Sequence, residues 1–352
     1  MGATGCGQCL GARREGPAAG ARRQPAAAGA AIDVAVSVVR DDRGRVLLAE
    51  RTPRQVSAGF WELPGGKIDG AESAAQAAAR ELHEEIGIDA EGLAPWIVYE
   101  HAFPTKRVRL HFFRADRWRG QPHGREGQRL AWVDAAAPAV GPLLPSNARA
   151  LAALGLPPLL AITHAGDGAG TQAFVARELP ALLAAGVRLL QVRESRLSGA
   201  QRVHFARRIG ERARAHGARM MLAGTALECS QAAADGQHST AAQLRASSAR
   251  PPVALWSASC HDLDDLRCAE RLGADFVIVS PVCASATHPG AAALGWANFA
   301  HIAAATPLPV YAQGGLGAAD LAPARRHGAA GIAVNAGALL GAGSAAAAAG
   351  VP

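Results

Sequence analysis

Lysine, cysteine and long apolar runs are scarce in this chain of 352 residues, and each scarcity excludes a class of reaction or of protein. Only Lys67 and Lys106 are lysines among 36 basic residues, so Schiff-base chemistry is excluded beyond residue 106. Six irregularly spaced cysteines do not suit an extracellular disulfide framework. No apolar run reaches the roughly 18 residues of a membrane span, so we expect a soluble, cytoplasmic protein with no membrane partner.

The net charge of +7 is spread along the chain. Residues 1–30 carry +3, residues 31–157 are neutral and the remainder carries +4. Lys and Arg nowhere form a stripe with interleaved aromatic residues, which binding to a nucleic acid polymer requires. We therefore expect small molecules as partners.

Length and composition predict two folded domains between two short ends. The chain is about twice as long as an average domain, and 49% of its residues are hydrophobic, enough for a full core. We assign a disordered Ala/Gly/Arg-rich extension to residues 1–30, a first domain to 31–155, a second to 156–345 and a tail to 346–352. An excess of Arg over acidic residues, as in the extension, is also typical of organelle transit peptides.

Hydrophobic periodicity predicts an α/β fold for both domains. In the first, alternation predicts a hairpin at 32–40 and 45–51, and helical spacing predicts a helix over 72–86 that Gly87 stops. Further strands are expected at 96–103, 108–118 and 129–133, and a short helix at 147–154. After residue 158, eight buried strands alternate with helices, which favours a small (β/α)8 barrel or an open, doubly wound sheet. These strands are expected at 160–163, 189–193, 219–222, 236–239, 253–257, 276–280, 310–313 and 331–334.

Charge is concentrated in the stretch GKIDGAESAAQAAARELHEEIGI at residues 66–88. Glu81, Glu84 and Glu85 stand at i, i+3 and i+4, so a helix places all three carboxylates on one face. Such a face is either solvated or bridged by a cation, and Mg²⁺ prefers carboxylate oxygens while it binds substrate phosphates. Arg80 is within reach of Glu72 and ties the start of the helix to its middle.

The complete pattern is Gly, five residues, Glu, seven residues and then Arg-Glu-Leu-x-Glu-Glu-x-Gly-Ile, and it resembles the Nudix box at every defined position. Residues 32–155 are similar to the MutT branch of that superfamily, whose enzymes remove oxidised guanine nucleotides. The similar stretches include AER at 49–51, ELPGGKI at 62–68, YEHAFP at 99–104 and LLPSNARALAAL at 143–154.

The resemblance implies a Nudix α/β/α sandwich with a mixed sheet and a hydrolase that uses Mg²⁺, or Mn²⁺ in its place. The implied reaction converts 8-oxo-dGTP to 8-oxo-dGMP and diphosphate. The metal-binding and catalytic carboxylates would be Glu81, Glu84, Glu85 and Glu126, with the Gly65 carbonyl as a further ligand and with Gly66, Glu72, Arg80 and Gly87 in structural positions. Which carboxylate takes the proton of water stays open, because coupled acids share their titration.

Two further residues are candidates for contacts with the nucleotide. Asn147 falls where MutT-like enzymes place an amide that donates to and accepts from the edge of the oxidised guanine. Its alternative role is to cap the helix that follows. Arg51 is either a phosphate contact or a surface residue of its strand.

Residues 159–341 resemble the thiamine phosphate synthase and TenI-like barrels, through motifs such as LLQVRES at 189–195, ADGQHST at 234–240 and VYAQGGLG at 310–317. The resemblance implies a phosphorylated ligand at the C-terminal ends of the strands. Its site would be formed by Gln191, Arg193, Gly314, Gly315, Asn335, Ala336 and Gly337. The synthases carry a lysine where this chain has Ser195, and an Asn-Asp pair where it has LAGT at 222–225, so we expect no synthase activity. His238, His261 and His288 are either functional or structural.

Three functions are consistent with these residues. The leading interpretation is an 8-oxo-dGTP diphosphatase joined to a barrel of altered chemistry. Alternatively, the first domain hydrolyses a thiamine-related or other nucleoside diphosphate substrate. In the third, the barrel is a ligand-binding module without turnover.

Overall fold

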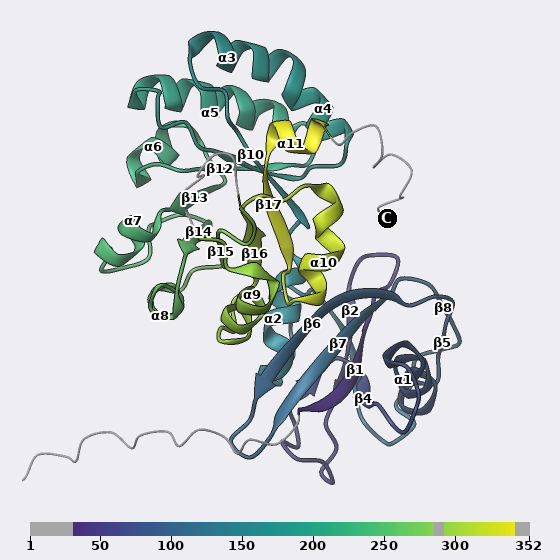
Figure 1. Cartoon of the computed structure of the whole chain (residues 1–352). Coiled ribbons are helices and arrows are strands. Elements are labelled where there is room, and N and C mark those ends of the chain that lie inside the picture. Colours follow the sequence, from purple (N-terminus) through teal and green to yellow (C-terminus); the bar gives the residue numbers. More distant parts are fainter. Residues whose placement is uncertain (1–30, 285–291, 342–352) are drawn as a thin grey trace, which may run out of the picture.

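The computed structural model describes residues 31–284 and 292–341, which form three N-terminal sheets and a C-terminal barrel (Figure 1). The expected extension at 1–30, the tail at 346–352 and His288 lie outside the described residues. Among the residues that are described, no helix has both the length and the apolar character needed to cross a membrane.

The N-terminal part has a mixed sheet, as the sequence predicts. Its order is β4 (Gly65–Lys67), β1 (Ile32–Val39), β7 (Arg107–Ala115) and β6 (Ala94–Ala102). β1 runs parallel to β7, whereas β4 and β6 pair antiparallel with their neighbours. A second sheet holds β3 (Trp61–Glu62), β2 (Val46–Glu50) and β9 (Leu130–Val133), and β5 (Asp89–Ala90) pairs with β8 (Trp118–Arg119).

The predicted hairpin of residues 32–40 and 45–51 is wrong. A single antiparallel bridge joins Arg40 to Val46, after which β1 and β2 enter different sheets. β1 has β4 on one edge and β7 on the other, so neither edge is left to pair with β2. The alternation of side chains was interpreted correctly as two strands, but it does not say which strands pair.

Helix α1 (Ala74–Glu81) continues into a π-helical turn, η1 (Leu82–Ile86). Ser73 caps the helix, and its hydroxyl and the Gln76 side chain bond reciprocally to the backbone. The helix therefore begins two residues later than predicted. Its end is as predicted, because Gly87 adopts the left-handed conformation, with φ of 73°, that terminates helices.

Helix α2 (Pro145–Leu154) corrects the alternative interpretation of Asn147. Leu144 is the N-cap residue, its side chain makes no capping bond, and Pro145 occupies the first turn. Asn147 lies inside the helix and is only 2% exposed. Its side chain is therefore free of a capping role.

Eight parallel strands close into a barrel, which rules out the open, doubly wound alternative. They are β10 (Leu159–Ile162), β11 (Leu189–Val192), β12 (Arg219–Leu222), β13 (Gly236–Ser239), β14 (Leu255–Cys260), β15 (Phe276–Val279), β16 (Val310–Gln313) and β17 (Gly331–Asn335). The helical segments are α3 (Gly168–Ala173), η2 (Phe174–Glu178), α4 (Leu179–Ala184), α5 (Gly199–Arg214), α6 (Ala226–Gln231), α7 (Ala241–Ala246), α8 (Leu263–Leu272), α9 (Gly295–Ala304), η3 (Ala318–Asp320), α10 (Leu321–Arg326) and α11 (Ala336–Gly341). Every predicted barrel strand overlaps an observed one.

The N-terminal part packs against the end of the barrel at which the strands begin. β10 starts only five residues after α2 ends, and β6 contacts α9 and α10 (Figure 1). One apolar cluster runs from Phe112 and Leu151 to Leu160 and Tyr311 inside the barrel. The described residues of the N-terminal part thus contact the end at which the strands begin, whereas ligands of such barrels bind at the opposite end.

Candidate active site

Two carboxylates converge on Gly65 and Gly66, which follow the bend at Pro64 and begin β4, and we call this segment the glycine turn. The backbone N–H of Gly65 donates to Glu85 Oε2 at 3.3 Å. A Cβ at Gly66 would overlap the Glu81 carboxylate, so only glycine allows this close approach. Glu81 and Glu85, two of the three acids on the predicted face, are thus held directly against the backbone of β4.

Arg80 organises the acidic face from its exposed side. Its guanidinium bonds to Glu72 at 2.8 Å, to Glu81 at 2.9 Å and to Glu84 at 2.9 Å. The predicted pair with Glu72 is therefore present. Glu84 is 56% exposed at its side chain and points to Arg80, so it does not join the other two acids at the glycine turn.

Burial shapes the electrostatics of the inner acids. Desolvation, followed by the nearby charges of Glu81 and Glu62, raises the pKa of Glu85 to about 8. The pKa of Glu81 is also raised, mainly by burial and against the opposing effect of Arg80. The positive charge near these two acids is too small to offset the cost of ionising them in a buried position.

Glu126 is exposed on a loop that is fastened to the end of the helix. The Gln128 side chain donates to the Glu85 carbonyl at 3.0 Å and accepts from the Glu126 N–H at 2.8 Å. The Glu126 charge contributes to the raised pKa values of Glu81 and Glu85. The loop therefore brings the Glu126 carboxylate to the same region without direct contact, and its part in metal binding stays a prediction.

Within residues 31–284 and 292–341, no three His, Cys, Asp or Glu side chains are arranged to hold a metal ion as they stand. Arg80 engages Glu84, and Glu126 is turned to solvent. Glu81 and Glu85 nevertheless fit a divalent cation, because two acids of raised pKa face one backbone turn. Carboxylate and backbone oxygens are the donors that Mg²⁺ and Mn²⁺ favour.

Sequence reasoning missed Glu62. Its carboxylate pairs with Arg51 Nη1 at 2.5 Å, and burial raises its pKa despite this partner. Arg51 is therefore engaged by Glu62 and is no simple surface residue, while its contact with phosphate stays a prediction. The position of Glu62 at the start of ELPGGKI, next to the glycine turn, was the available signal.

Asn147 reaches the same segment from helix α2. Its Oδ1 accepts from the Leu63 N–H at 2.9 Å, which fixes the orientation of the amide. In the part of the chain that is described, Nδ2 donates to no acceptor. One half of the amide thus holds the Leu63 backbone, and the other half is free for a ligand.

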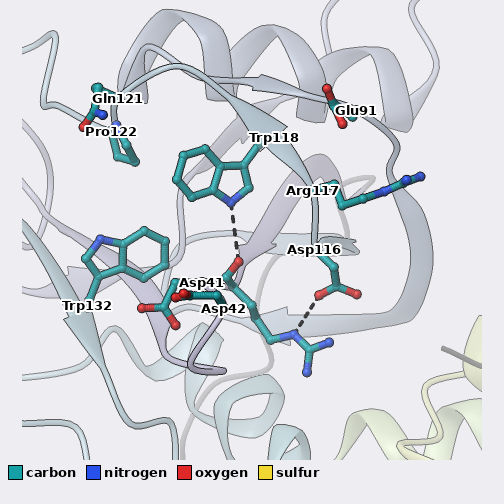
Figure 2. A pocket seen from close by; sticks show the side chains of 10 residues that line it. Asp41, Asp42, Glu91, Asp116, Arg117, Trp118, Gln121, Pro122 and Trp132 are labelled. Carbon is teal, nitrogen blue, oxygen red and sulfur yellow. Dashed lines mark hydrogen bonds and ion pairs between the residues drawn. The ribbon is translucent and has the colours of Figure 1, made fainter.

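A surface pocket of about 560 Å³ lies elsewhere, beside the stacked rings of Trp118 and Trp132 (Figure 2). None of the predicted site residues lines it. Two of its charged groups satisfy each other, since Arg40 pairs with Asp116 at 2.7 Å, and the Arg40 carbonyl accepts from the Trp118 ring N–H. The predicted site residues therefore lie apart from this pocket.

Two family models match separate parts of the chain. The NUDIX domain model matches residues 31–154, and the TMP-TENI model, described as thiamine monophosphate synthase, matches residues 159–338. The 8-oxo-dGTP diphosphatase of Haemophilus influenzae is 39% identical over 118 residues, which is 34% of this chain and 87% of that protein. The chain belongs to both families.

Two further relatives are each similar to one of the two parts of the chain. The 8-oxo-dGTP diphosphatase of Escherichia coli is 34% identical over 102 residues, covering 29% of this chain and 79% of that protein. The thiamine biosynthesis bifunctional protein ThiM/ThiE of Symbiobacterium thermophilum is 35% identical over 160 residues, covering 44% of this chain but 33% of that protein. The first domain is thus a Nudix hydrolase, and the second a TMP-TENI barrel.

The TMP-TENI barrel gathers its predicted ligand residues at one end. β11, β10, β17 and β16 are consecutive neighbours, so the residues that follow β11, β16 and β17 lie at the same rim. Gln191 has a buried Oε1 without a partner, and burial lowers the pKa of Arg193. In the described residues the Arg193 guanidinium has no ion pair.

The barrel histidines have different surroundings. His238 is buried, with Nδ1 at 2.8 Å from the Ser257 hydroxyl and Nε2 at 2.9 Å from the Ser259 hydroxyl. His261 Nδ1 bonds to the Ser280 carbonyl at 2.8 Å. Both rings have structural partners.

Gly87 offers a stability test of the Nudix helix end. Gly87→Ala should lower the free energy of unfolding by about 1–2 kcal/mol for the left-handed conformation, and by more because the new Cβ would displace the His123 ring and break its bond to the Gln121 carbonyl. Gly127→Ala is the matched control, since Gly127 has φ of 82° with open space around it. Urea denaturation should show the larger loss for Gly87→Ala, and equal losses would contradict the close packing.

Proposed function

We propose that the Nudix domain hydrolyses 8-oxo-dGTP to 8-oxo-dGMP and diphosphate, and so removes an oxidised precursor before DNA synthesis. The supporting observation is the short segment from Leu63 to Gly65. Leu63 bonds to Asn147, and Gly65 bonds to Glu85. Two residues of extended chain span about 7 Å, so a base-reading amide and the carboxylates lie within the length of one nucleotide.

Glu81, Glu84, Glu85, Glu126 and the Gly65 carbonyl would hold the divalent cation, Mg²⁺ or Mn²⁺ in its place. When bound, such an ion neutralises phosphate charge and lowers the pKa of an attacking water. Glu84 must first leave Arg80, to which it is bonded at 2.9 Å. Arg80 then keeps the helix in place through Glu72.

The acids also provide the acceptor for the proton of water. Glu85 and Glu81 influence each other's charge, so the set titrates together and the accepted proton belongs to the coupled group. Asn147 Nδ2 supplies a donor for a carbonyl oxygen of the base. Its Oδ1, which already accepts from Leu63, has one lone pair left for the base.

Product analysis tests the reaction class. With 8-oxo-dGTP in water enriched in ¹⁸O, we expect 8-oxo-dGMP and diphosphate, with one labelled oxygen in one of these two products. Release of 8-oxo-dGDP and inorganic phosphate would contradict the proposal.

For the barrel we propose retained binding of a phosphorylated ligand without thiamine phosphate synthesis. The ligand would bind at the C-terminal ends of the strands, to Gln191, Arg193, Gly314, Gly315 and the backbone of 335–337. Ser195 is exposed and uncharged at the position of the synthase lysine. In the LAGT segment at 222–225, the Thr225 side chain already caps helix α6.

The nearest acid to LAGT is also engaged. Glu228 pairs with Arg202 and accepts from the Thr225 N–H at 2.8 Å. Two sources of diphosphate stabilisation, the lysine and the acid-bound Mg²⁺, are thus missing together.

We expect the full chain to form no thiamine phosphate from the pyrimidine diphosphate and thiazole phosphate, in vitro or by complementation of a thiamine-requiring strain. Calorimetry should detect thiazole phosphate at micromolar affinity, about −8 kcal/mol. Complementation would overturn the claim of lost synthesis. Absence of binding would leave the barrel as a scaffold without this ligand.

A further inference from the structure

Arg149 is a buried cation at the junction of the two domains. It is 3% exposed, and burial lowers its pKa to about 10. Its Nη1 donates to the Ala303 carbonyl at 2.7 Å, and Nη2 donates to the Gly328 carbonyl. No carboxylate among the described residues pairs with it, so the barrel backbone and the Tyr99 ring, 4.7 Å away, compensate its charge.

The two carbonyls come from the ends of two barrel helices. Ala303 lies in the last turn of α9, where carbonyls lack intrahelical donors and carry the negative end of the helix dipole. Gly328 follows α10 and has φ of 91°. A guanidinium has donors in a planar fork, so it fixes direction where an apolar side chain would only fill space.

Helix α2 connects this junction to the active site. Residues two apart in a helix lie on nearly opposite faces, so Asn147 and Arg149 point to different sides of α2. Asn147 holds the Leu63 N–H at 2.9 Å on the Nudix side. Tyr99, under the guanidinium, donates its hydroxyl to the Ser146 carbonyl at 2.7 Å and fixes the start of the helix.

We propose that Arg149 is a positioning residue through which the barrel sets the base discrimination of the Nudix site. By binding the barrel backbone, it fixes the rotation of α2 and keeps Asn147 against Leu63. The discrimination part of this inference rests on the proposed function of Asn147. The barrel thereby influences nucleotide selection through the end at which its strands begin. Its own predicted ligand site lies at the opposite end.

The test replaces Arg149 in the full chain. Arg149→Met keeps the apolar stem and removes the donors, and it should raise KM for 8-oxo-dGTP about fivefold while kcat for dGTP stays within about twofold. Hydrogen exchange at the Leu63 amide should accelerate about fivefold. The Thr163 amide, bonded to the Gln191 carbonyl inside the barrel, should not change, which separates this effect from global unfolding.

Three variants complete the experiment. Tyr311→Phe removes a bond to the Pro157 carbonyl in the linker without touching α2, so it should match wild type. Gly328→Ala disturbs the same contact from the barrel side, because its Cβ would lie 3.3 Å from Arg149 Nη2 and its φ of 91° strains the backbone that carries the accepting carbonyl, and it should reproduce the loss. Arg149→Lys keeps the charge but not the fork, and should restore part of the protection at Leu63.

The outcomes separate the two proposals. Unchanged Leu63 exchange in both Arg149→Met and Gly328→Ala overturns the positioning role. Equal effects of Tyr311→Phe and Arg149→Met overturn it as well, because any weakening of the junction would then suffice. If wild type shows no preference for 8-oxo-dGTP, the proposed function fails, while Leu63 exchange still decides whether Arg149 positions Asn147.

Discussion

Glu85→Gln and Glu81→Gln should each lower kcat for nucleotide hydrolysis about a thousandfold, as expected for loss of a major electrostatic group in an active site. Glutamine keeps the shape of the side chain and removes its charge. The fold should survive, because burial already disfavours the ionised forms and raises the pKa of both acids. Steady-state hydrolysis at saturating Mg²⁺, with circular dichroism as the check on folding, measures the effect.

Glu91→Gln is the matched control for these variants. Glu91 pairs with Arg119 at 2.5 Å beside the surface pocket, outside the carboxylate site. Its kcat should stay near that of wild type. Near-normal turnover of Glu85→Gln at saturating Mg²⁺ would refute the metal-binding role of the acidic face.

Asn147→Ala should reduce the preference for 8-oxo-dGTP over dGTP by about fivefold to about 150-fold, as a lost buried hydrogen bond of about 1–3 kcal/mol implies. The effect should act on discrimination, because dGTP makes less use of the contact. The measurement is the ratio of kcat/KM for the two nucleotides.

Asn147→Asp separates the two halves of the amide. It keeps an oxygen for the Leu63 N–H and removes the donor that the base would use. Its discrimination should fall as in Asn147→Ala, while the Leu63 amide keeps its protection from exchange. Equal slowing of both nucleotides in both variants would show that Asn147 only supports the glycine turn.

Local sequence patterns predicted where the strands and helices lie better than they predicted which strands pair. Each barrel strand is a short buried run between turn residues, and that signal needs no distant information. The hairpin failed because the pairing of β1 depends on β4 and β7, which arrive from residues 65–67 and 107–115. Closure of the barrel likewise depends on β10 meeting β17, a contact between the ends of the domain.

The arrangement of the candidate active site, like the pairing of the strands, could be predicted only in part. The helical spacing of Glu81, Glu84 and Glu85 predicted a shared acidic face, but the structure brings only Glu81 and Glu85 to the glycine turn. Spacing does not reveal that Arg80 takes Glu84 outward. Nor does any motif identify Arg149, whose partners are backbone carbonyls more than 150 positions away.

The central claim is the nucleotide specificity of the Nudix domain, and a panel of kcat/KM values for the full chain tests it most directly. The panel contains 8-oxo-dGTP, dGTP, ADP-ribose and thiamine diphosphate at equal Mg²⁺. We expect 8-oxo-dGTP to exceed each of the others by at least about tenfold, the factor that one well-placed hydrogen bond supplies. A higher kcat/KM for ADP-ribose or thiamine diphosphate would contradict the account.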